Sequence, residues 1–560
     1  MNSGAGTRSG LWRASALIAS LWLLNALLTF HNVWPTVFIR PSGELSIELA
    51  ILLLILAAWQ RLRGALPRRL LIVLAALFVL GAIGRYAEVT APALYGREVN
   101  LYWDLPHVGA LTGMLARVAS PWLLILGTIG VLAGFALLYY AALCSWQRIA
   151  NELQSPSVSI GASVVAIAVI IGFTLENIAE ERPRIPRFSM PIAKTYGEQF
   201  AKVGTAMLER GTTRRLPPSP ALSSTLSLID GSDVMVVFVE SYGRVAYDNR
   251  EFFAALAPSR AELADAVRDT GRSVISGYVE SPTFGGGSWL SHLNFLTGVE
   301  VSEYSRAQLL MTQTRRNFGH ALAEHGYRRV GLMPGLKLDW PEGVFYDFDR
   351  IYDDAALGYD GPAFGWWRIP DQFSLARLDV LERSDAGTPL FIFFPTVSTH
   401  TPFRPTPPYQ SDWSRMLSTQ PFDAAPLQHS LAQLPDWGNL AESYKSALSY
   451  SLQTLAGYLR TQARDDLILI VIGDHQPPAV VSGPNAPWDV PVHVIASKTA
   501  VLKSLAECGF VAGLIPAPHA VGRMHQLGPA LLRAFESTEV PTKCPLQPGD
   551  TAPGHTADRS

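Results

Sequence analysis

The sequence predicts a two-part protein: an N-terminal transmembrane domain of about five helices, then a C-terminal α/β domain whose mostly parallel sheet is covered by helices. Three observations predict this. The chain has 560 residues, too many for a single core, and charged residues are scarce before about residue 175. Long apolar runs fill the first part. Short β-branched runs alternate with helical stretches in the second.

The apolar runs of the first part are expected to be transmembrane helices, because about 20 apolar residues cross a hydrocarbon layer of ~30 Å. None of them contains a charged side chain, and the second and third are the shortest. The five runs are Ala14 to Phe30, Leu49 to Gln60, Leu70 to Gly84, Val118 to Gln147 and Leu153 to Leu175.

The distribution of arginines predicts the orientation, because positively charged short loops remain in the cytoplasm. Arg8 and Arg13 precede the first run, and four more arginines lie in the loop between the second and third runs, at residues 61–69. We therefore expect the N-terminus inside and, after an odd number of crossings, the C-terminal domain outside. This describes a multi-pass protein of the bacterial inner (cell) membrane whose soluble domain is periplasmic or otherwise extracytoplasmic.

Residues 1–175 are thus expected to form the transmembrane domain and residues 232–540 the extracytoplasmic domain. Between them, residues 176–231 are rich in proline and mixed charge and read as a juxtamembrane linker with one helix near Lys194 to Arg210. Residues 541–560 are expected to be a disordered tail. The formal net charge of −2 leaves no basic surface for nucleic acid, which we exclude as a partner.

The three cysteines show no CxxC spacing, so a thiolate zinc site or a redox motif is not expected. Cys144 lies in an apolar run. Cys508 and Cys544 both lie in the C-terminal part, where they could form a disulfide in an oxidising compartment or remain free thiols. The sequence leaves both possibilities open.

Six short apolar runs of the second part predict buried strands, and the stretches between them have helical character. The expected strands are Val234 to Val239, Val274 to Ser276, Arg329 to Met333, Leu390 to Phe394, Leu467 to Ile472 and Val490 to Ile495. The expected helices are Glu251 to Asp269, Phe318 to His325 and Leu440 to Arg464.

Polar residues capable of chemistry come directly after several of these strands. They are Glu240, the segment Ser398 to His400, the segment Gly473 to His475, and Ser288 after a Gly285 to Gly287 turn. Because ligands of open α/β sheets bind beyond the carboxyl ends of the strands, we expect these residues to converge on one site.

The residue types at this expected site suit a metal-assisted transfer of a phosphorus-containing group. A hard cation neutralises the phosphate oxygens and lowers the pKa of an attacking hydroxyl. The side chains of Glu240, Asp474 and His475 are suitable metal ligands, and Ser288 could be both a ligand and the nucleophile. The glycine turn and the following helix N-terminus offer backbone N–H groups to an anion.

Each of these features also has a structural interpretation. Glu240 could cap a helix or pair with an arginine, and Gly-Asp-His could be a simple turn. Thr283 is the alternative nucleophile, because its hydroxyl lies on the same loop as Ser288. His400 could be a histidine that is hydrogen-bonded within its own loop.

The motifs Val236-Val-Phe-Val-Glu240-Ser and Ile472-Gly-Asp474-His475 resemble the metal-binding strand ends of lipoteichoic acid synthases and related membrane phosphoglycerol transferases, members of the alkaline phosphatase and sulfatase superfamily. Ser288-Trp-Leu-Ser-His-Leu-Asn-Phe-Leu-Thr-Gly298 resembles the sulfatase nucleophile helix. The resemblance implies Ser288 as the nucleophile, His400 as the histidine that binds the phosphate or protonates the leaving group, and Mn or Mg rather than Zn as the metal.

The sequence also departs from the family pattern. The segment around Lys337 and Trp340 resembles the substrate segment of the synthases, but Pro341 and Glu342 stand where an arginine is expected. Lys337 or Arg368 would then have to bind the substrate phosphate. Trp366 and Trp367 could stack on a sugar.

The nucleophile position is not cysteine, so the formylglycine of sulfatases cannot form, and sulfatase activity is not expected. His292 stands where sulfatases have an arginine, and we count it among the substrate-binding candidates.

The resemblance implies a membrane-bound metal-dependent transferase that moves a phosphoglycerol or phosphoethanolamine group from a membrane phospholipid to an envelope glycan or lipid, through a covalent Ser288 intermediate. A membrane-tethered phosphodiesterase or phosphatase is the alternative that the same residues support. A catalytically inactive partner in envelope assembly is the third. The sequence does not indicate the oligomeric state, the donor head group or the number of metal ions.

Overall fold

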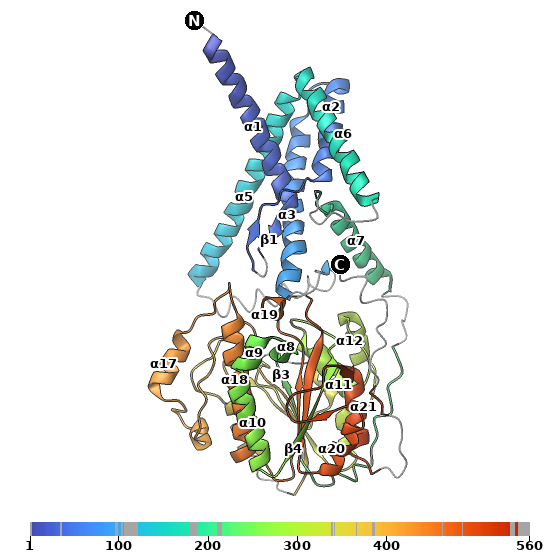
Figure 1. Ribbon diagram of the computed structural model, residues 1–560, viewed down its shortest axis with the longest axis vertical. Coiled ribbons are helices and arrows are strands. Elements are labelled where there is room, and N and C mark those ends of the chain that lie inside the picture. Colours follow the sequence, from blue (N-terminus) through green and yellow to red (C-terminus); the bar gives the residue numbers. More distant parts are fainter. Residues whose placement is uncertain are drawn as a thin grey trace. The chain divides into compact units, whose positions relative to one another are not determined.

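The computed structural model confirms the predicted fold class, with apolar N-terminal helices followed by a mixed, mostly parallel sheet covered by helices (Figure 1). The chain divides into two compact units, one of residues 1–93 and 97–214 and the other of residues 94–96 and 215–560. The structure describes residues 3–33, 36–95, 99–101, 105, 121–178, 187–209, 216–337, 340, 342–365, 367–382, 387–461, 463–483, 485–537 and 544–546.

Each of the five predicted apolar segments coincides with a helix of the first unit where the structure describes it; residues 118–120 of the fourth segment lie outside the described residues. Within the described residues, parts of α1, α3, α5 and α6 are long and apolar enough to cross a membrane, whereas α2 has only 17 residues. The helices are α1 (Ser3–Thr29), α2 (Ile47–Arg63), α3 (Arg68–Tyr95), α5 (Pro121–Glu152), α6 (Pro156–Ile178) and α7 (Ile192–Glu209).

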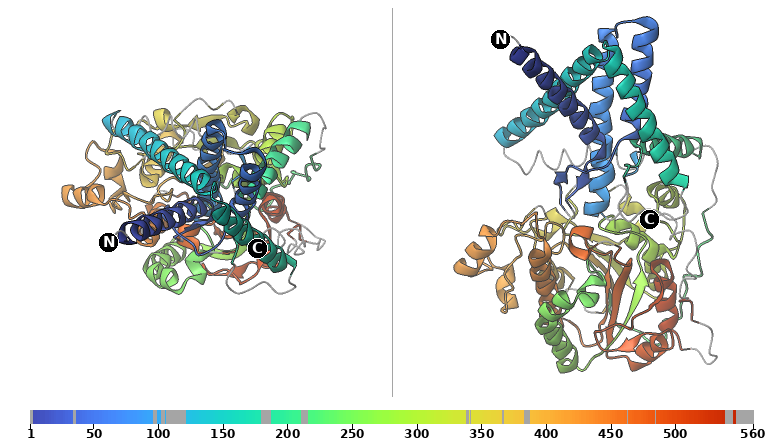
Figure 2. Two further views of the ribbon diagram at one scale, coloured as in Figure 1. Left: turned by 90° about the horizontal axis from the view of Figure 1, so that it is seen from above. Right: turned by 45° about the horizontal axis from the view of Figure 1, so that its top comes forward.

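Within this unit, α1 packs against α5 and α2 packs against α6, and the right view of Figure 2 shows α1 and α5 crossing. A two-stranded hairpin, β1 (His31–Asn32) and β2 (Ile39–Arg40), follows the end of α1. The side chain of Arg85 in α3 is buried. Its guanidinium donates hydrogen bonds to Glu88 at 3.2 Å and to the carbonyl of Phe30 at 3.0 Å, which offset the loss of hydration. α7 coincides with the helix predicted inside the linker.

The second unit contains a nine-stranded sheet with the order β10-β4-β9-β8-β3-β7-β5-β6, and β11 pairs with β4. The strands are β3 (Val234–Val239), β4 (Ser273–Glu280), β5 (Arg328–Leu332), β6 (Arg350–Tyr352), β7 (Leu390–Pro395), β8 (Ile468–Gly473), β9 (Asp489–Ala496), β10 (Val511–Ala512) and β11 (Ala520–Arg523). The run from β8 through β6 is parallel, whereas β9 is antiparallel to both of its neighbours.

Helices cover both faces of this sheet. They are α8 (Val245–Asp248), α9 (Arg250–Ala255), α10 (Ala257–Asp269), α11 (Ser288–Thr297), α12 (Tyr304–Met311), α13 (Phe318–Ala323), α14 (Gly343–Tyr346), α15 (Asp354–Leu357), α16 (Asp371–Glu382), α17 (Ala424–Ala432), α18 (Ala441–Thr461), α19 (Ala479–Ser482), α20 (Thr499–Ala506) and α21 (Met524–Ala534), with a 3-10 helix at Trp413–Leu417.

The side chains of the central strand β3 pack into two hydrophobic cores, one on each face of the sheet. Its six side chains are at most 1% exposed, and alternate residues point to opposite faces. Val234 and Val236 join the core under α11, α13, α20 and α21, whereas Met235 and Val237 join the core under α10, α16 and α18. Burial on both faces explains why this strand reads as a continuous apolar run.

Two predicted elements differ from the structure. The helix expected over Glu251 to Asp269 is two helices that meet at Leu256, because Pro258 cannot donate the backbone hydrogen bond of a helix interior and instead lies in the first turn of α10. The strand expected to end at Ser276 continues to Glu280. Gly277 does not end it, because β4 pairs with β9 without a break from Ser273 to Glu280. The ring of Phe510 packs beside Gly277, 3.2 Å from where a Cβ would lie.

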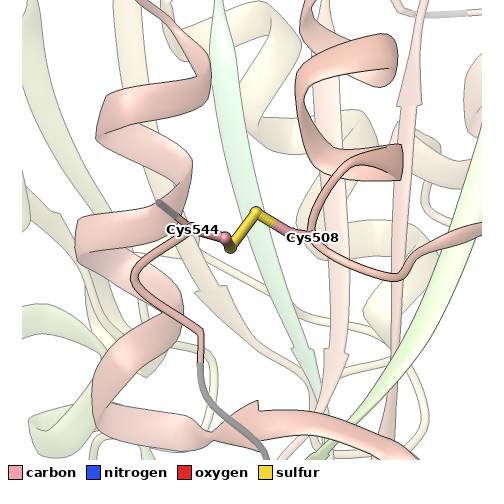
Figure 3. Close-up of a disulfide and its surroundings, with 2 residues drawn as sticks. All are labelled: Cys508 and Cys544. Atoms are coloured by element: carbon pink, nitrogen blue, oxygen red, sulfur yellow. A yellow bond between two sulfur atoms is a disulfide. The ribbon is translucent and has the colours of Figure 1, made fainter. Parts of the chain in front are cut away.

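Cys508 and Cys544 form a disulfide in the structure (Figure 3). Cys544 belongs to the segment predicted as a disordered tail; residues 541–543 and 547–560 of that segment lie outside the described part of the chain. The bridge closes a loop of 36 residues, for which loop-closure entropy corresponds to about 2–4 kcal/mol of stability.

We expect Cys544→Ser to lower the thermal midpoint of the purified full-length protein, since its unfolded state regains that loop entropy. The measurement is thermal unfolding with and without reductant. Cys144→Ser is the matched control, because Cys144 is a free cysteine in the transmembrane helix α5. A reductant that lowers the midpoint of Cys544→Ser as much as that of the wild type would contradict the expectation.

A buried polar network between β4 and β9 depends on a neutral histidine. His493 Nδ1 lies 2.6 Å from the hydroxyl of Ser276, which itself donates to the carbonyl of Gly513, so Nδ1 carries the proton. His493 Nε2 then accepts from the hydroxyl of Tyr242 at 3.0 Å. Burial lowers the pKa of His493 to about 3, which keeps the ring neutral.

Because the folded-state pKa of His493 is depressed, its contribution to stability is present above the ordinary histidine pKa and is lost as the pH falls toward 3. We expect a loss of roughly 2 kcal/mol between pH 7 and pH 5. The measurement is the thermal midpoint of the full-length protein at both pH values. His493→Gln should show a smaller fall than the wild type, and His429→Gln, an exposed position, should fall like the wild type.

Candidate active site

Three segments that lie far apart in the sequence meet at the carboxyl end of the central parallel strands. Glu240 directly follows β3, Asp474 and His475 directly follow β8, and α11 begins at Ser288. Because β3 and β8 are parallel neighbours whose last residues pair, their following residues lie side by side. The structure therefore brings together the four residues predicted as metal ligands.

The turn after β3 fixes the direction of Glu240. Its backbone N–H donates to Thr396 Oγ at the end of β7, at 3.1 Å. The next residue, Ser241, has a φ of 57°, a left-handed conformation that costs a non-glycine residue energy and persists only where the surroundings fix it. Here the N–H of Ser241 donates to Asp474 Oδ1 at 2.7 Å, so the two strand ends are joined directly.

Asp474 is held by hydrogen bonds on several sides. Its Oδ1 also accepts from the backbone N–H of His475 at 2.6 Å. Its main-chain carbonyl accepts from the hydroxyls of Ser281 and Ser291, each at 2.6 Å. The carboxylate thus keeps a single orientation, with Oδ2 3.6 Å from His475 Nε2.

The imidazole of His475 is oriented by its other nitrogen. Nδ1 donates to the carbonyl of Gln476 at 2.7 Å, which leaves Nε2 facing the cluster. Nε2 lies 3.4 Å from Glu240 Oε1 and 3.2 Å from Ser288 Oγ. A backbone carbonyl on one ring nitrogen and a free second nitrogen is the usual arrangement of a metal-binding histidine.

The glycine turn before α11 places Ser288. Gly287 has a φ of 78°, which a residue with a side chain rarely adopts, and a Cβ there would lie 3.1 Å from Thr283 Oγ. The hydroxyl of Ser288 donates to Glu240 Oε2 at 2.8 Å. The hydroxyl of Thr283 instead donates to the carbonyl of Gly286 at 2.5 Å, so its proton is directed into its own loop.

The charges of the cluster are strongly coupled. Burial opposes ionisation of Glu240, but the hydrogen bond and charge of His475 outweigh it and hold the pKa of Glu240 below its usual range, with a smaller effect from His400. Burial and the charge of Glu240 raise the pKa of Asp474. Burial alone would lower the pKa of His475, but Asp474 and Glu240 raise it to about 9.

This donor set fits a divalent cation. Ligand atoms of Glu240, Asp474 and His475 all lie within 4.8 Å of one another, and all three side chains are almost completely buried. Among the described residues, the ion pairs of the two carboxylates are with His475 alone. Two buried carboxylates with one imidazole are the oxygen and nitrogen ligands that Mn²⁺, Mg²⁺ and Zn²⁺ accept.

His400 lies on the loop after β7, close enough for its charge to act on Glu240. Its Nδ1 donates to the carbonyl of Thr401 at 2.8 Å, and its ring contacts that of Trp367 edge-on, with centroids 5.0 Å apart. The predicted role of His400 toward a phosphate or a leaving group stays a prediction. Trp366, the other tryptophan of that pair, lies outside the described residues.

The loop that carries His400 is held by a residue that the sequence did not single out. Asp371, the first residue of α16, is 2% exposed and accepts from the N–H groups of Val397 and Ser398 at 2.9 and 3.1 Å. Burial raises the pKa of Asp371 to about 6, against the effect of these bonds. In the sequence, the position of Asp371 is marked only by the preceding Ile369-Pro pair, since proline followed by a carboxylate is typical of the start of a helix.

Two predicted phosphate-binding residues lie in a charge cluster of their own. Arg368 donates from Nε to Asp354 Oδ2 at 3.1 Å and from Nη2 to the carbonyl of Tyr359 at 2.7 Å. Burial lowers the pKa of Lys337, with Asp354 acting against it and Arg368 adding to it. Arg368, one of the two residues expected to bind the substrate phosphate, is therefore paired with Asp354. Binding of a substrate phosphate by Arg368 or Lys337 stays a prediction.

The other two substrate-binding candidates are packed among aromatic rings. Trp340 stacks on Tyr346, with ring centroids 5.0 Å apart. His292, one turn after Ser288 on α11, contacts the rings of Phe238 and Phe393 at 4.6 and 5.4 Å. Burial lowers the pKa of His292 to about 3, so this ring is neutral, and direct contact of either residue with a substrate stays a prediction.

Comparison with protein families finds one match. Residues 270–492 match the family model described as Sulfatase, a segment that includes Ser288, His400, Asp474 and His475 but not Glu240. A search of curated proteins finds no match.

Comparison with solved structures finds several proteins of low sequence identity. The lipoteichoic acid synthase LtaP from Listeria monocytogenes is 12% identical with a TM-score of 0.37, covering 60% of this chain and 78% of its own. The lipooligosaccharide phosphoethanolamine transferase A (EptA) from Neisseria meningitidis is 11% identical with a TM-score of 0.45, covering 88% of this chain and 87% of its own. The phosphoglycerol transferase GacH from Streptococcus pyogenes is 13% identical with a TM-score of 0.34, covering 60% of this chain and 80% of its own.

Proposed function

We propose that this chain, whose residues 270–492 match the sulfatase family model, is a membrane-bound, metal-dependent phospho-group transferase. It takes a phosphoglycerol or phosphoethanolamine group from a membrane phospholipid and transfers it to a cell-envelope glycan or lipid. The observation that carries this proposal is the position of Ser288 Oγ, 2.8 Å from Glu240 Oε2 and 3.2 Å from His475 Nε2.

Transfer of a sulfate group is not proposed, because the family's sulfatases need a cysteine that is converted to formylglycine and this chain has Ser288 there. A serine hydroxyl is instead a suitable nucleophile for a phosphodiester. The apolar helices of the first unit support a lipid donor, since enzyme and donor then share one plane and the reaction gains effective concentration.

We assign the metal to Glu240, Asp474, His475 and Ser288, with Mn²⁺ or Mg²⁺ favoured over Zn²⁺. When bound, such a cation neutralises charge on the phosphate oxygens and favours the ionised hydroxyl. Removing it with a chelator should abolish activity, and adding Mn²⁺ back should restore it.

The residues of the chain account for both halves of a double displacement. Ser288 Oγ attacks phosphorus and loses its proton along its hydrogen bond to Glu240 Oε2, and this proton passes on to solvent because the pKa of Glu240 is held below its usual range. The bond from phosphorus to the diacylglycerol oxygen breaks, and His400 gives that oxygen a proton. In the second half, a hydroxyl of the acceptor attacks the phosphoserine ester and its proton goes to His400, while Ser288 is released and takes up a proton from solvent.

The orientation proposed from the arginines places this domain on the outer side of the inner membrane. The disulfide between Cys508 and Cys544 supports this, because such bonds persist in oxidising compartments outside the cytoplasm. A reporter enzyme that is active only outside the cytoplasm, fused after Ser560, tests the orientation.

The experiment that tests the function uses full-length protein purified in detergent with Mn²⁺. It is mixed in turn with phosphatidylglycerol and phosphatidylethanolamine, and the diacylglycerol released is measured. We expect release from one of them, and no release from either would overturn the proposal. Release that is unaffected by an added glycan acceptor, with free glycerol phosphate or ethanolamine phosphate as product, would indicate a hydrolase instead.

A further inference from the structure

The first unit contains an apolar groove of about 470 Å³ between α1, α3 and α5. One face of each helix lines it. The lining residues of α3 are Val79, Ala82, Ile83 and Tyr86, which follow the i, i+3, i+4, i+7 spacing of a single helix face. The volume falls within the ~300–1,000 Å³ of pockets that bind small molecules.

The groove has a buried floor and exposed walls. Leu27 and Phe30 are 8% and 5% exposed and form part of the floor, whereas Trp22 and Phe135 are 58% and 40% exposed and stand at the sides. From Trp22 to Thr29, the last residue of α1, the groove extends over seven residue steps, about 10 Å along the helix axis, and Phe30 follows directly. This is close to half of a hydrocarbon layer of ~30 Å, which is about the depth of one leaflet.

A cation lies at one end of the groove. Arg40 of β2 is among the lining residues and is exposed, and within the described part of the chain its guanidinium has no carboxylate partner. Tyr86 lies at the same end, with its hydroxyl donating to the carbonyl of Val37 at 3.0 Å. A tyrosine and an arginine at the end of an apolar helix face are typical of the head-group region of a membrane.

We propose that this groove binds one glycerophospholipid molecule, with an acyl chain along α1 and α3 and the anionic phosphate on Arg40. The apolar groove matches the chain, and the single cation at its end matches the phosphodiester. Other occupants fit less well, because a protein helix is wider than a groove between helices that already touch, and a fully apolar ligand would leave Arg40 without a counter-ion.

In the orientation proposed above, the end of α1 faces the outside, so the bound lipid would belong to the leaflet on the side of the catalytic domain. This last point rests on the proposed function and orientation, whereas the binding site itself does not. A lipid held there is of the class that the reaction consumes.

The test measures binding rather than activity. Native mass spectrometry of the full-length protein, delipidated in detergent and titrated with phosphatidylglycerol, counts the lipids bound. We expect one lipid that binds before the others, with diacylglycerol, which lacks the phosphate, binding more weakly. Arg40→Gln should lower the affinity for this first lipid about five-fold, which is the effect of one arginine near an anionic lipid surface.

A second variant tests the acyl-chain part. In Ala26→Phe the larger side chain fills the groove from α1, where Ala26 is partly exposed. The affinity for the first lipid should then fall at least about tenfold, which is the loss expected when two methylenes leave apolar contact. The matched controls are Arg13→Gln and Ala19→Phe, both at exposed positions of α1 outside the groove. Equal lipid binding by test and control variants would show ordinary bilayer lipid only and overturn the proposal, even if the enzyme released diacylglycerol.

Discussion

Replacing Ser288 by alanine is expected to lower the rate of diacylglycerol release at least about 10⁴-fold, because removing a nucleophile leaves only binding and electrostatic stabilisation of the uncatalysed reaction. The same substitution should abolish the covalent intermediate. The measurements are initial rates with Mn²⁺ present, and mass spectrometry of protein quenched in acid after mixing with a labelled donor lipid. The mass added should match the transferred group and map to the peptide that contains Ser288.

The matched control is Thr283→Ala, since Thr283 carries the only other hydroxyl that the sequence offered as nucleophile on this loop. Its proton is bonded to the carbonyl of Gly286, so we expect its loss to change turnover less than about tenfold, the cost of one local hydrogen bond. A labelled adduct that persists in Ser288→Ala and disappears in Thr283→Ala would reverse the assignment.

The central residues of this site could be predicted because the end of a buried strand can be recognised in the sequence. Glu240 and Asp474 each close a run of buried apolar residues, and parallel neighbours bring such ends to one edge of a sheet. The distance along the chain between them, more than 200 residues, does not matter to this argument. The glycine run before Ser288 was equally informative, since it requires backbone conformations that other residues avoid.

The surroundings of the cluster could not be predicted in the same way. Asp371 fixes the loop of His400 through two backbone N–H groups, and Ser281 and Ser291 fix Asp474 through its carbonyl. Bonds to backbone groups leave no pattern of residue types, because any loop of suitable shape offers the same donors and acceptors. Such residues are identified only when the fold places them.

Sequence alone also could not show how Arg368 is used. A cation near the expected substrate segment is suitable for a phosphate, but the fold pairs it with Asp354. The sequence also could not predict that β9 is antiparallel to β8. A strand buried on both faces has the same composition whether it runs parallel or antiparallel.

Replacing Asp474 by asparagine is expected to remove the metal while keeping the fold. The amide retains one oxygen, which can still accept from the N–H groups of Ser241 and His475 as Oδ1 does now. The second oxygen becomes an NH₂ group, which cannot bind a cation. Affinity for Mn²⁺ should fall by more than the roughly 10–100-fold that follows loss of a group one contact away from a metal, and turnover by about 10³-fold.

The measurement is metal content by elemental analysis after dialysis against Mn²⁺, together with turnover over a range of Mn²⁺ concentrations. Asp489→Asn is the matched control, since Asp489 lies at the start of β9 and pairs with Arg244 at 2.8 Å, away from the cluster. This control should keep its metal and its activity. If Asp474→Asn holds Mn²⁺ as tightly as the control does, then Glu240, Asp474 and His475 are not the metal site, and the buried carboxylates need another source of positive charge.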